Sequence, residues 1–235
     1  MFMYRVEDKF GCSENEMLLL ESRVKAVTHP DAYSDNGSYR ITSLYFDNCY
    51  DSHLADTEDG VDERKKYRIR IYNGSTAVIK LEVKYKRYNR IFKRSRTISI
   101  DTAEKLINGE CAQDPEPGTD SPVTMFNLAL RHDLLRPRIV VEYDRSAYVF
   151  EPGGVRITFD RDIRCSGNTA GFLDDTCSFR MINDMDRVVE VKYDEYIPGF
   201  IEGVLENGNM IQTSCSKYRL CREYEQEHME VYRCP

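Results

Sequence analysis

Lys80-Leu81-Glu82-Val83-Lys84-Tyr85-Lys86 alternates strictly between charged and apolar side chains. Because successive side chains of a β-strand point to opposite faces, the stretch predicts a strand with one charged and one apolar face. Residues 67–72 follow the same pattern with two arginines, and residues 188–193 repeat the Glu-Val-Lys core. Three separate strands that each pair an apolar face with a charged one need a common explanation.

The composition limits the possible classes of protein, and the sequence shows where the basic residues concentrate. The 235 residues suffice for one large domain or two small ones. The net charge is −7, yet residues 64–70 hold five basic residues and no acid, and residues 80–96 hold eight basic residues and one acid. An acidic chain that concentrates its bases on a few strands is not a general nucleic-acid binder. It indicates a local site for an anion.

The sequence shows no sign of a membrane segment or of export. No apolar run approaches the roughly 20 residues that span a bilayer. Residues 1–11 carry charges throughout and lack the apolar core of a signal peptide. The eight cysteines form no C-x-x-C pair, so a zinc site is not expected. We therefore expect a cytoplasmic protein with reduced thiols and no membrane segment of its own.

Alternation and turn signals predict seven or eight strands, mostly joined by tight turns. The expected strands are residues 3–10, 39–46, 64–72, 77–88, 91–100, 138–150, 155–164 and 187–193. Helices are expected at residues 13–28, 101–109, 121–133, 198–206 and 216–227, with caps at Ser13 and Asp101. Residues 88–90 are a turn candidate. Strands joined by short turns are antiparallel, so residues 1–235 predict a single α+β domain on a large antiparallel sheet.

The charged strand faces have two interpretations. In most alternating antiparallel strands the polar face is wet, and the pattern alone favours that reading. Solvated faces, however, normally mix in Thr, Ser, Gln and Asn, whereas these faces are almost all Arg, Lys and Glu. The alternative is a closed barrel with a charged interior and helices over its apolar outside. So many enclosed cations need an anion such as polyphosphate, with a divalent metal held by glutamates, to neutralise them.

Eight short motifs, in this order, resemble those of VTC domains, the polyphosphate-polymerase domains of the triphosphate tunnel metalloenzyme superfamily. They are Arg5-x-Glu7-x-Lys9, Ser43-Leu44-Tyr45-Phe46-Asp47, Lys66-Tyr67-Arg68-Ile69-Arg70, Glu82-Val83-Lys84, Tyr143-x-Arg145-x-Ala147-Tyr148, Val155-Arg156-Ile157-Thr158-Phe159-Asp160, Glu190-Val191-Lys192-Tyr193 and Ser216-Lys217-Tyr218. The resemblance is to the short stand-alone bacterial members and covers about residues 3–222. It implies a closed eight-stranded antiparallel β-barrel, a tunnel with a charged lumen and helices packed on its outside.

The resemblance also implies an activity: metal-dependent transfer of the γ-phosphoryl group of ATP onto inorganic polyphosphate. Arginine grips phosphate oxygens with two hydrogen bonds and lysine acts as a compact point charge, which suits this substrate. The catalytic residues implied are Arg68, Arg70, Lys84, Arg145 and Arg156. The substrate-binding residues implied are Lys9, Lys93, Lys192 and Lys217. Glu190 is the first choice as ligand to Mn²⁺ or Mg²⁺, followed by Glu82, Glu7 and Asp160.

Other readings stay open at this point. Glu82 and Glu190 are also suited to be salt-bridge partners only, and Asp47 is expected to cap the segment that follows it. Two residues depart from the family pattern, Asp8 and Glu142. The alternative functions are a triphosphatase, in which water is the acceptor, and a module that binds polyphosphate without turnover. The barrel reading makes a directional prediction: Lys84 points inward at an anion, and Leu81, Val83 and Tyr85 point outward under helices.

Overall fold

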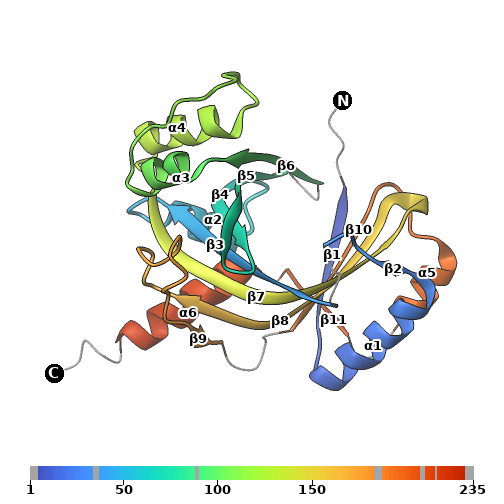
Figure 1. Ribbon diagram of the computed structural model, residues 1–235. Helices are drawn as coiled ribbons and strands as arrows, with labels where there is room; N and C mark the ends of the chain where they lie inside the picture. The colour runs from blue at the N-terminus through green and yellow to red at the C-terminus, as the bar shows by residue number, and fades with distance from the viewer. Residues whose placement is uncertain are drawn as a thin grey trace.

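A single antiparallel sheet organises the computed structural model, which describes residues 5–33, 37–87, 90–182, 187–206, 210–214 and 216–230 (Figure 1). The sheet order is β11-β1-β10-β8-β7-β3-β4-β5-β6, with β2 beside β7 and β9 beside β8. The eight long strands are β1 (Val6–Gly11), β3 (Tyr39–Asp47), β4 (Glu63–Tyr72), β5 (Ser75–Arg87), β6 (Arg90–Ile98), β7 (Arg136–Phe150), β8 (Val155–Ser166) and β10 (Val188–Tyr193). The two-residue strands are β2 (His29–Pro30), β9 (Arg180–Met181) and β11 (Ile211–Gln212). The turn expected at residues 88–90 falls largely outside the described residues.

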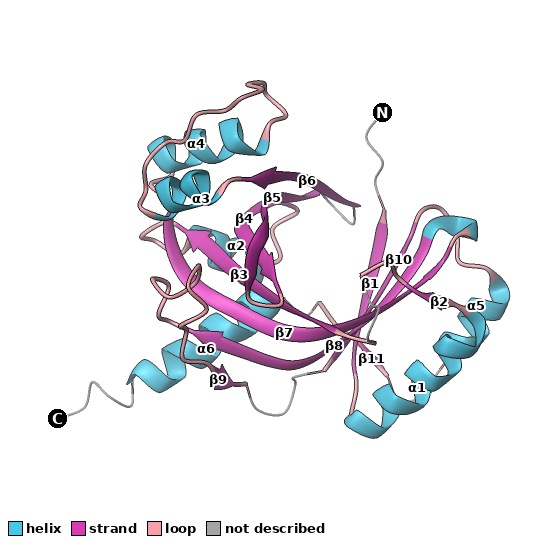
Figure 2. Ribbon diagram, viewed as in Figure 1, coloured by secondary structure: helices cyan, strands magenta, loops and turns pink. Residues whose placement is uncertain are grey.

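The sheet curves strongly, and its two ends approach each other (Figure 2). Within the described residues the last strand, β6, meets β1 at one isolated bridge, between Arg5 and Ile91. Further along β1, Phe10 and Gly11 pair with β11 instead. Part of that edge of β1 is therefore already paired, and no continuous ladder joins it to β6. The mixed helix and antiparallel sheet fold is as expected, but the described ladder is not the closed barrel that we expected.

Four helices cover the apolar outer face of the sheet in two groups. In Figure 1, α3 (Ile100–Ile107) and α4 (Pro122–His132) lie on one side, and α1 (Glu14–Val27) and α5 (Gly199–Leu205) lie on the other. Leu81 and Val83 are fully buried in a cluster that includes residues of α3 and α4, and Tyr85 packs against it. The outward direction predicted for these three side chains is confirmed.

The last helix, α6 (Lys217–Glu230), is the exception to the expectation that helices pack outside. Tyr218 of α6 stacks on Tyr45, with ring centroids 5.1 Å apart. Tyr218 and Cys221 are buried in one cluster with Tyr45 and Tyr143, and both of these tyrosines face the interior cavity described below. The expectation is therefore wrong for α6, which packs on the concave side of the sheet. Its apolar residues pack there against apolar residues of the strands.

Two helix caps show how far local sequence determines local structure. Ser13 accepts a hydrogen bond from the Glu16 amide, and the Glu16 carboxylate accepts one from the Ser13 amide, so the predicted capping box is confirmed. The cap predicted at Asp101 is wrong. The Ser99 hydroxyl accepts from the Thr102 amide, so the cap of α3 lies two residues earlier than predicted. Asp101 instead pairs with Lys105, at 2.9 Å.

Asp47 joins three elements at the end of β3, and the cap predicted for it is confirmed. Its two carboxylate oxygens accept from the His53 and Leu54 amides at 3.0 Å, in the first turn of α2 (Ser52–Glu58). The Tyr218 hydroxyl of α6 donates to it at 2.7 Å. Asp47 is fully buried, so its removal leaves several donors unpaired.

We expect Asp47→Ala to lower the free energy of unfolding by about 3 kcal/mol, because a cap and a buried charge-assisted hydrogen bond are lost together. Tyr218→Phe removes one of these three hydrogen bonds and should lower the free energy of unfolding by about 1 kcal/mol. Urea denaturation followed by circular dichroism measures both. A loss below 1 kcal/mol for Asp47→Ala would contradict this account of how α6 is anchored.

Candidate functional site

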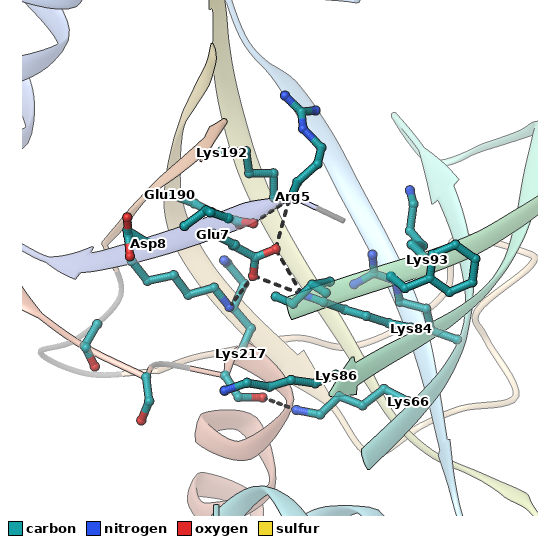
Figure 3. Close-up of a pocket in the computed structure, with 18 of the residues that line it drawn as sticks. Arg5, Glu7, Asp8, Lys66, Lys84, Lys86, Lys93, Glu190, Lys192 and Lys217 are labelled. Carbon is teal, nitrogen blue, oxygen red and sulfur yellow. Dashed lines mark hydrogen bonds and ion pairs between the residues drawn. The ribbon is translucent and has the colours of Figure 1, made fainter. Parts of the chain in front are cut away.

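The concave face of the sheet encloses a cavity of about 980 Å³ (Figure 3). Thirteen of its lining residues are lysine or arginine, and three are acidic. All nine basic residues implied by the resemblance line it: Lys9, Arg68, Arg70, Lys84, Lys93, Arg145, Arg156, Lys192 and Lys217. Of the four acids, Glu7 and Glu190 line it, whereas Glu82 and Asp160 are buried and are not among the lining residues. The cavity therefore presents a large excess of positive charge.

The wall formed by β4, β5 and β6 is built around Glu82. The register places Arg68 directly opposite Glu82 and Ser95 beside it on the other strand. Arg68 Nε donates to Glu82 Oε2 at 2.7 Å, and Lys93 Nζ donates to Oε1 at 2.8 Å. Burial alone would raise the pKa of Glu82, but Arg68 and Arg70 outweigh it and hold that pKa well below its usual range. Glu82 is thus a charged counter-ion whose two oxygens are both engaged.

Two tyrosines hold the arginine side chains of this wall from the other side. Arg68 Nη1 donates to the Tyr45 hydroxyl at 2.9 Å. Arg70 donates to Ser43 Oγ at 3.0 Å and to the Tyr143 hydroxyl at 3.2 Å. Fixed guanidinium planes lose little freedom when they bind an anion such as a phosphate group.

The opposite wall, from β1 and β10, combines two carboxylates with three lysines. Antiparallel pairing places Glu7 opposite Lys192 and Lys9 opposite Glu190. Lys192 Nζ lies 2.5 Å from Glu190 Oε1, and Lys9 Nζ lies 3.2 Å from Glu7 Oε1. Lys84 reaches across from β5 and lies 2.9 Å from the same Glu7 oxygen. Figure 3 shows Glu7, Lys84, Glu190 and Lys192 converging on one part of the cavity.

Both carboxylates of this wall are ionised. Burial and the neighbouring Glu190 would raise the pKa of Glu7, but Lys84 and the other two lysines lower it to about 2. Burial likewise opposes ionisation of Glu190, and Lys192 and Lys9 hold its pKa well below the usual range. Two adjacent negative charges therefore persist at the cavity wall because lysines offset them.

The third part of the site is centred on Asp160, which binds Arg145 and Lys217. Arg145 donates two parallel hydrogen bonds to its carboxylate, at 2.6 and 2.7 Å. Lys217, at the start of α6, lies 2.6 Å from Asp160 Oδ2. Burial would raise the pKa of Asp160, but Arg145 and Lys217 lower it to about 2. Arg156 stands nearby and donates to Asp31 at 2.5 Å and to the Tyr39 hydroxyl at 3.2 Å.

Comparison with known proteins identifies the family of this chain. The family described as the VTC domain matches residues 4–225, almost the whole chain. The chain belongs to the VTC domain family. Among curated proteins, none matches the sequence.

Several solved structures are similar to this VTC domain in fold. The PH1819 protein of Pyrococcus horikoshii OT3 is 17% identical with a TM-score of 0.49, and the match covers 94% of this chain and 99% of that one. The PH1012 protein of the same organism is 12% identical with a TM-score of 0.48, covering 92% and 98%. The Mimivirus capping enzyme triphosphatase is 11% identical with a TM-score of 0.34, covering 97% and 88%.

Sequence reasoning missed several residues of the VTC domain site. Lys66 lines the cavity and lies on the same strand face as Arg68. The alternation of side chains along this strand could therefore have predicted that Lys66 belongs to the site. Tyr45 and Tyr143 belong to quoted motifs, but nothing local shows that their hydroxyls accept from arginine. The family departure Glu142 faces away from the cavity, where Arg164 and Thr42 bond its two oxygens at 2.7 and 2.6 Å.

The pKa of Lys84 predicts how anion binding by the VTC domain depends on pH. Burial lowers this pKa to about 7, despite the opposing effect of Glu7. A bound phosphate group raises it again, so above about pH 7 each binding event takes up a proton. We expect the affinity for tripolyphosphate to fall as the pH rises from 7 to 9, by at most about tenfold per pH unit.

Isothermal titration calorimetry in two buffers of different ionisation enthalpy measures this proton uptake directly. Lys84→Arg supplies the control, because an arginine in the same position stays charged over the whole range. The difference between the two proteins removes the titration of tripolyphosphate itself. Equal proton uptake by both proteins would show that Lys84 is charged in the empty cavity.

Proposed function

We propose that this VTC domain transfers the γ-phosphoryl group of ATP onto inorganic polyphosphate inside the cavity. The observation that carries the proposal is the lining of thirteen basic and three acidic residues around about 980 Å³. Phosphoryl transfer is catalysed mainly by positioning and by stabilising charge on phosphate oxygens, which such a lining provides. We further propose that residues 1–235 form one cytoplasmic domain whose eight long strands act as a closed tunnel. Of the helices described, none has the length and apolarity to cross a bilayer.

The proposed roles follow from which wall each residue occupies. Arg68, Arg70 and Lys84 bind the triphosphate of ATP from the β4–β5 wall, and Arg145 and Arg156 bind it from β7 and β8. Lys9, Lys93, Lys192 and Lys217 bind the polyphosphate chain. In the empty cavity carboxylates hold most of these cations in place, and phosphate oxygens take over those contacts on binding. A terminal oxygen of the chain then forms a bond to the γ-phosphorus while the bond to the bridging oxygen breaks, and ADP leaves.

The carboxylates Glu7 and Glu190 fit a divalent cation that also binds the substrate. Both are ionised, both line the cavity, and their oxygens are the donors that Mg²⁺ and Mn²⁺ prefer. Across the described residues no group of three or more His, Cys, Asp or Glu side chains gathers to hold a metal. One or two carboxylates completed by substrate phosphates are the usual arrangement for Mg²⁺. Bound there, the ion would neutralise charge on the phosphate oxygens. Glu82 and Asp160, which are not among the lining residues, act as positioning acids instead.

Incubation of the pure protein with ATP and Mn²⁺ tests the proposal. Long-chain polyphosphate on a gel, together with ADP, is the expected result. Free phosphate without chains would instead establish a triphosphatase that uses water as acceptor. Unchanged ATP with tight polyphosphate binding would establish a binding module, and either of these two results overturns the proposal.

A further inference from the structure

Lys66 differs from the other lysines of the cavity in its surroundings. Its Nζ donates to Ser216 Oγ, 2.8 Å away at the start of α6, and lies 5.7 Å from the centre of the Tyr218 ring. By contrast, Lys93 contacts Glu82, and Lys217 contacts Asp160. Within the described part of the chain, no carboxylate lies within ion-pair distance of Lys66. Figure 3 shows Lys66 beside Lys86, close to α6.

The charged side chains around Lys66 carry the same sign as its ammonium group and disfavour its protonated form. Burial lowers its pKa well below the usual range, and Lys9, Lys84 and Arg68 lower it further. The largest influences on this pKa include no acid. A cation enclosed without a counter-ion costs stability, so its presence in a cavity wall suggests that a ligand supplies the missing negative charge. Lys86, on the same face of β5 as Lys84, likewise has no carboxylate within ion-pair distance among the described residues.

The position of Lys66 along β4 indicates which part of a bound ligand it contacts. Lys66 and Arg68 lie on the same face of β4, two residues or about 7 Å apart. Lys66 is paired in register with Lys84, and Arg64 with Lys86, so the cations continue beyond the Glu82 level in one direction. An anion held at Arg68 and Arg70 must extend along β4 to reach Lys66. A phosphoanhydride chain has this shape and a negative charge on every unit.

We propose that Lys66, Lys86 and the Ser216 hydroxyl form a second phosphate subsite, which binds units of a polyphosphate chain beyond the three held at Arg68 and Arg70. The inference rests on the proposed function for the nature of the ligand. The subsite needs no metal, since the charged side chains assigned to it are both lysines. Its consequence is selectivity for chain length: a long chain gains contacts that a triphosphate does not reach.

Lys66→Met and Lys65→Met, in the full chain with EDTA present, test the subsite. Lys65 neighbours Lys66 on the opposite face, where its Nζ lies 5.5 Å from the Tyr85 ring, so it is a matched control. Calorimetry measures binding of inorganic phosphate, tripolyphosphate and long-chain polyphosphate. We expect Lys66→Met to weaken long-chain binding about tenfold and tripolyphosphate binding by less than about twofold. Lys65→Met should leave all three unchanged.

One further measurement separates binding from structure. Lys66→Met should melt no lower than the wild type, because it removes an uncompensated cation. Unchanged long-chain affinity, an equal loss for tripolyphosphate, or a loss confined to inorganic phosphate each overturns the subsite.

The result of the subsite test can be told apart from the result of the activity test of the proposed function. If the wild type makes no polyphosphate from ATP but Lys66→Met still loses long-chain binding selectively, the function fails and the subsite stands. If the wild type makes polyphosphate and Lys66→Met binds long chains normally, only the subsite fails.

Discussion

Replacing Arg68 by alanine is expected to lower the rate of ADP release from ATP by about a thousandfold. The Arg68 guanidinium faces the cavity and is fixed between Glu82, at 2.7 Å, and the Tyr45 hydroxyl, at 2.9 Å. A guanidinium held in this way stabilises charge on the phosphate oxygens with little loss of freedom on binding. Steady-state measurement of kcat and KM for ATP, with Mn²⁺ present, checks the prediction.

The same substitution disturbs the fold, and the structure indicates how to separate the two effects. Arg68→Ala leaves the buried Glu82 with Lys93 and the more distant Arg70, so we expect a stability loss of about 3 kcal/mol. The double variant Arg68→Ala/Glu82→Gln removes the unpaired charge and should regain much of that stability. Its activity should remain lost. A folded double variant with near wild-type turnover would remove Arg68 from the site.

The direction of side chains was predictable because it is a local property of a strand. Alternation alone fixed that Leu81 and Val83 share one face and Lys84 takes the other, and the helices α3 and α4 bury the apolar face as expected. Which face encloses a cavity is not local. It became predictable only from the uniformity of the charges, since a solvated face has no need of lysine, arginine and glutamate alone.

The roles of the acids were not predictable, and the two Glu-Val-Lys strands show why. Glu82 and Glu190 have the same local sequence. Glu82 is paired with Arg68, which with Lys93 engages both of its oxygens. Glu190 lies between Lys9 and Thr158 and stays at the cavity wall. The difference comes from neighbouring strands distant in sequence, so identical motifs acquire different surroundings.

The placing of α6 shows a second limit of local reasoning. The motif Ser216-Lys217-Tyr218 predicted a phosphate contact, but its apolar residues gave no sign that the helix packs inside the sheet. That position depends on Asp47 and Tyr45, about 170 residues earlier, which bond and stack with Tyr218. As a result Lys217 reaches Asp160 and Ser216 reaches Lys66.

Glu190→Gln is expected to lower metal-dependent turnover by about a hundredfold while leaving anion binding intact. The amide keeps the shape of the side chain but loses the charge that a divalent cation needs. Lys192 and Arg145, now 2.5 and 3.6 Å from the carboxylate, lose part of their counter-charge. Tripolyphosphate should therefore bind as tightly as in the wild type, or more tightly, when EDTA is present. Turnover at increasing Mn²⁺ and metal-free calorimetry measure the two effects, which have opposite signs.

Glu142→Gln is the matched control, because Glu142 is an equally buried carboxylate on the outward face of β7. It is paired there with Arg164, at 2.7 Å, so its loss should destabilise the protein without changing turnover. A general effect of removing a buried acid would lower activity in both variants. Loss of turnover in Glu190→Gln alone, with metal-free anion binding preserved, assigns Glu190 to the metal. Weaker tripolyphosphate binding without metal would instead make Glu190 a support for its lysines, as Glu82 is for Arg68.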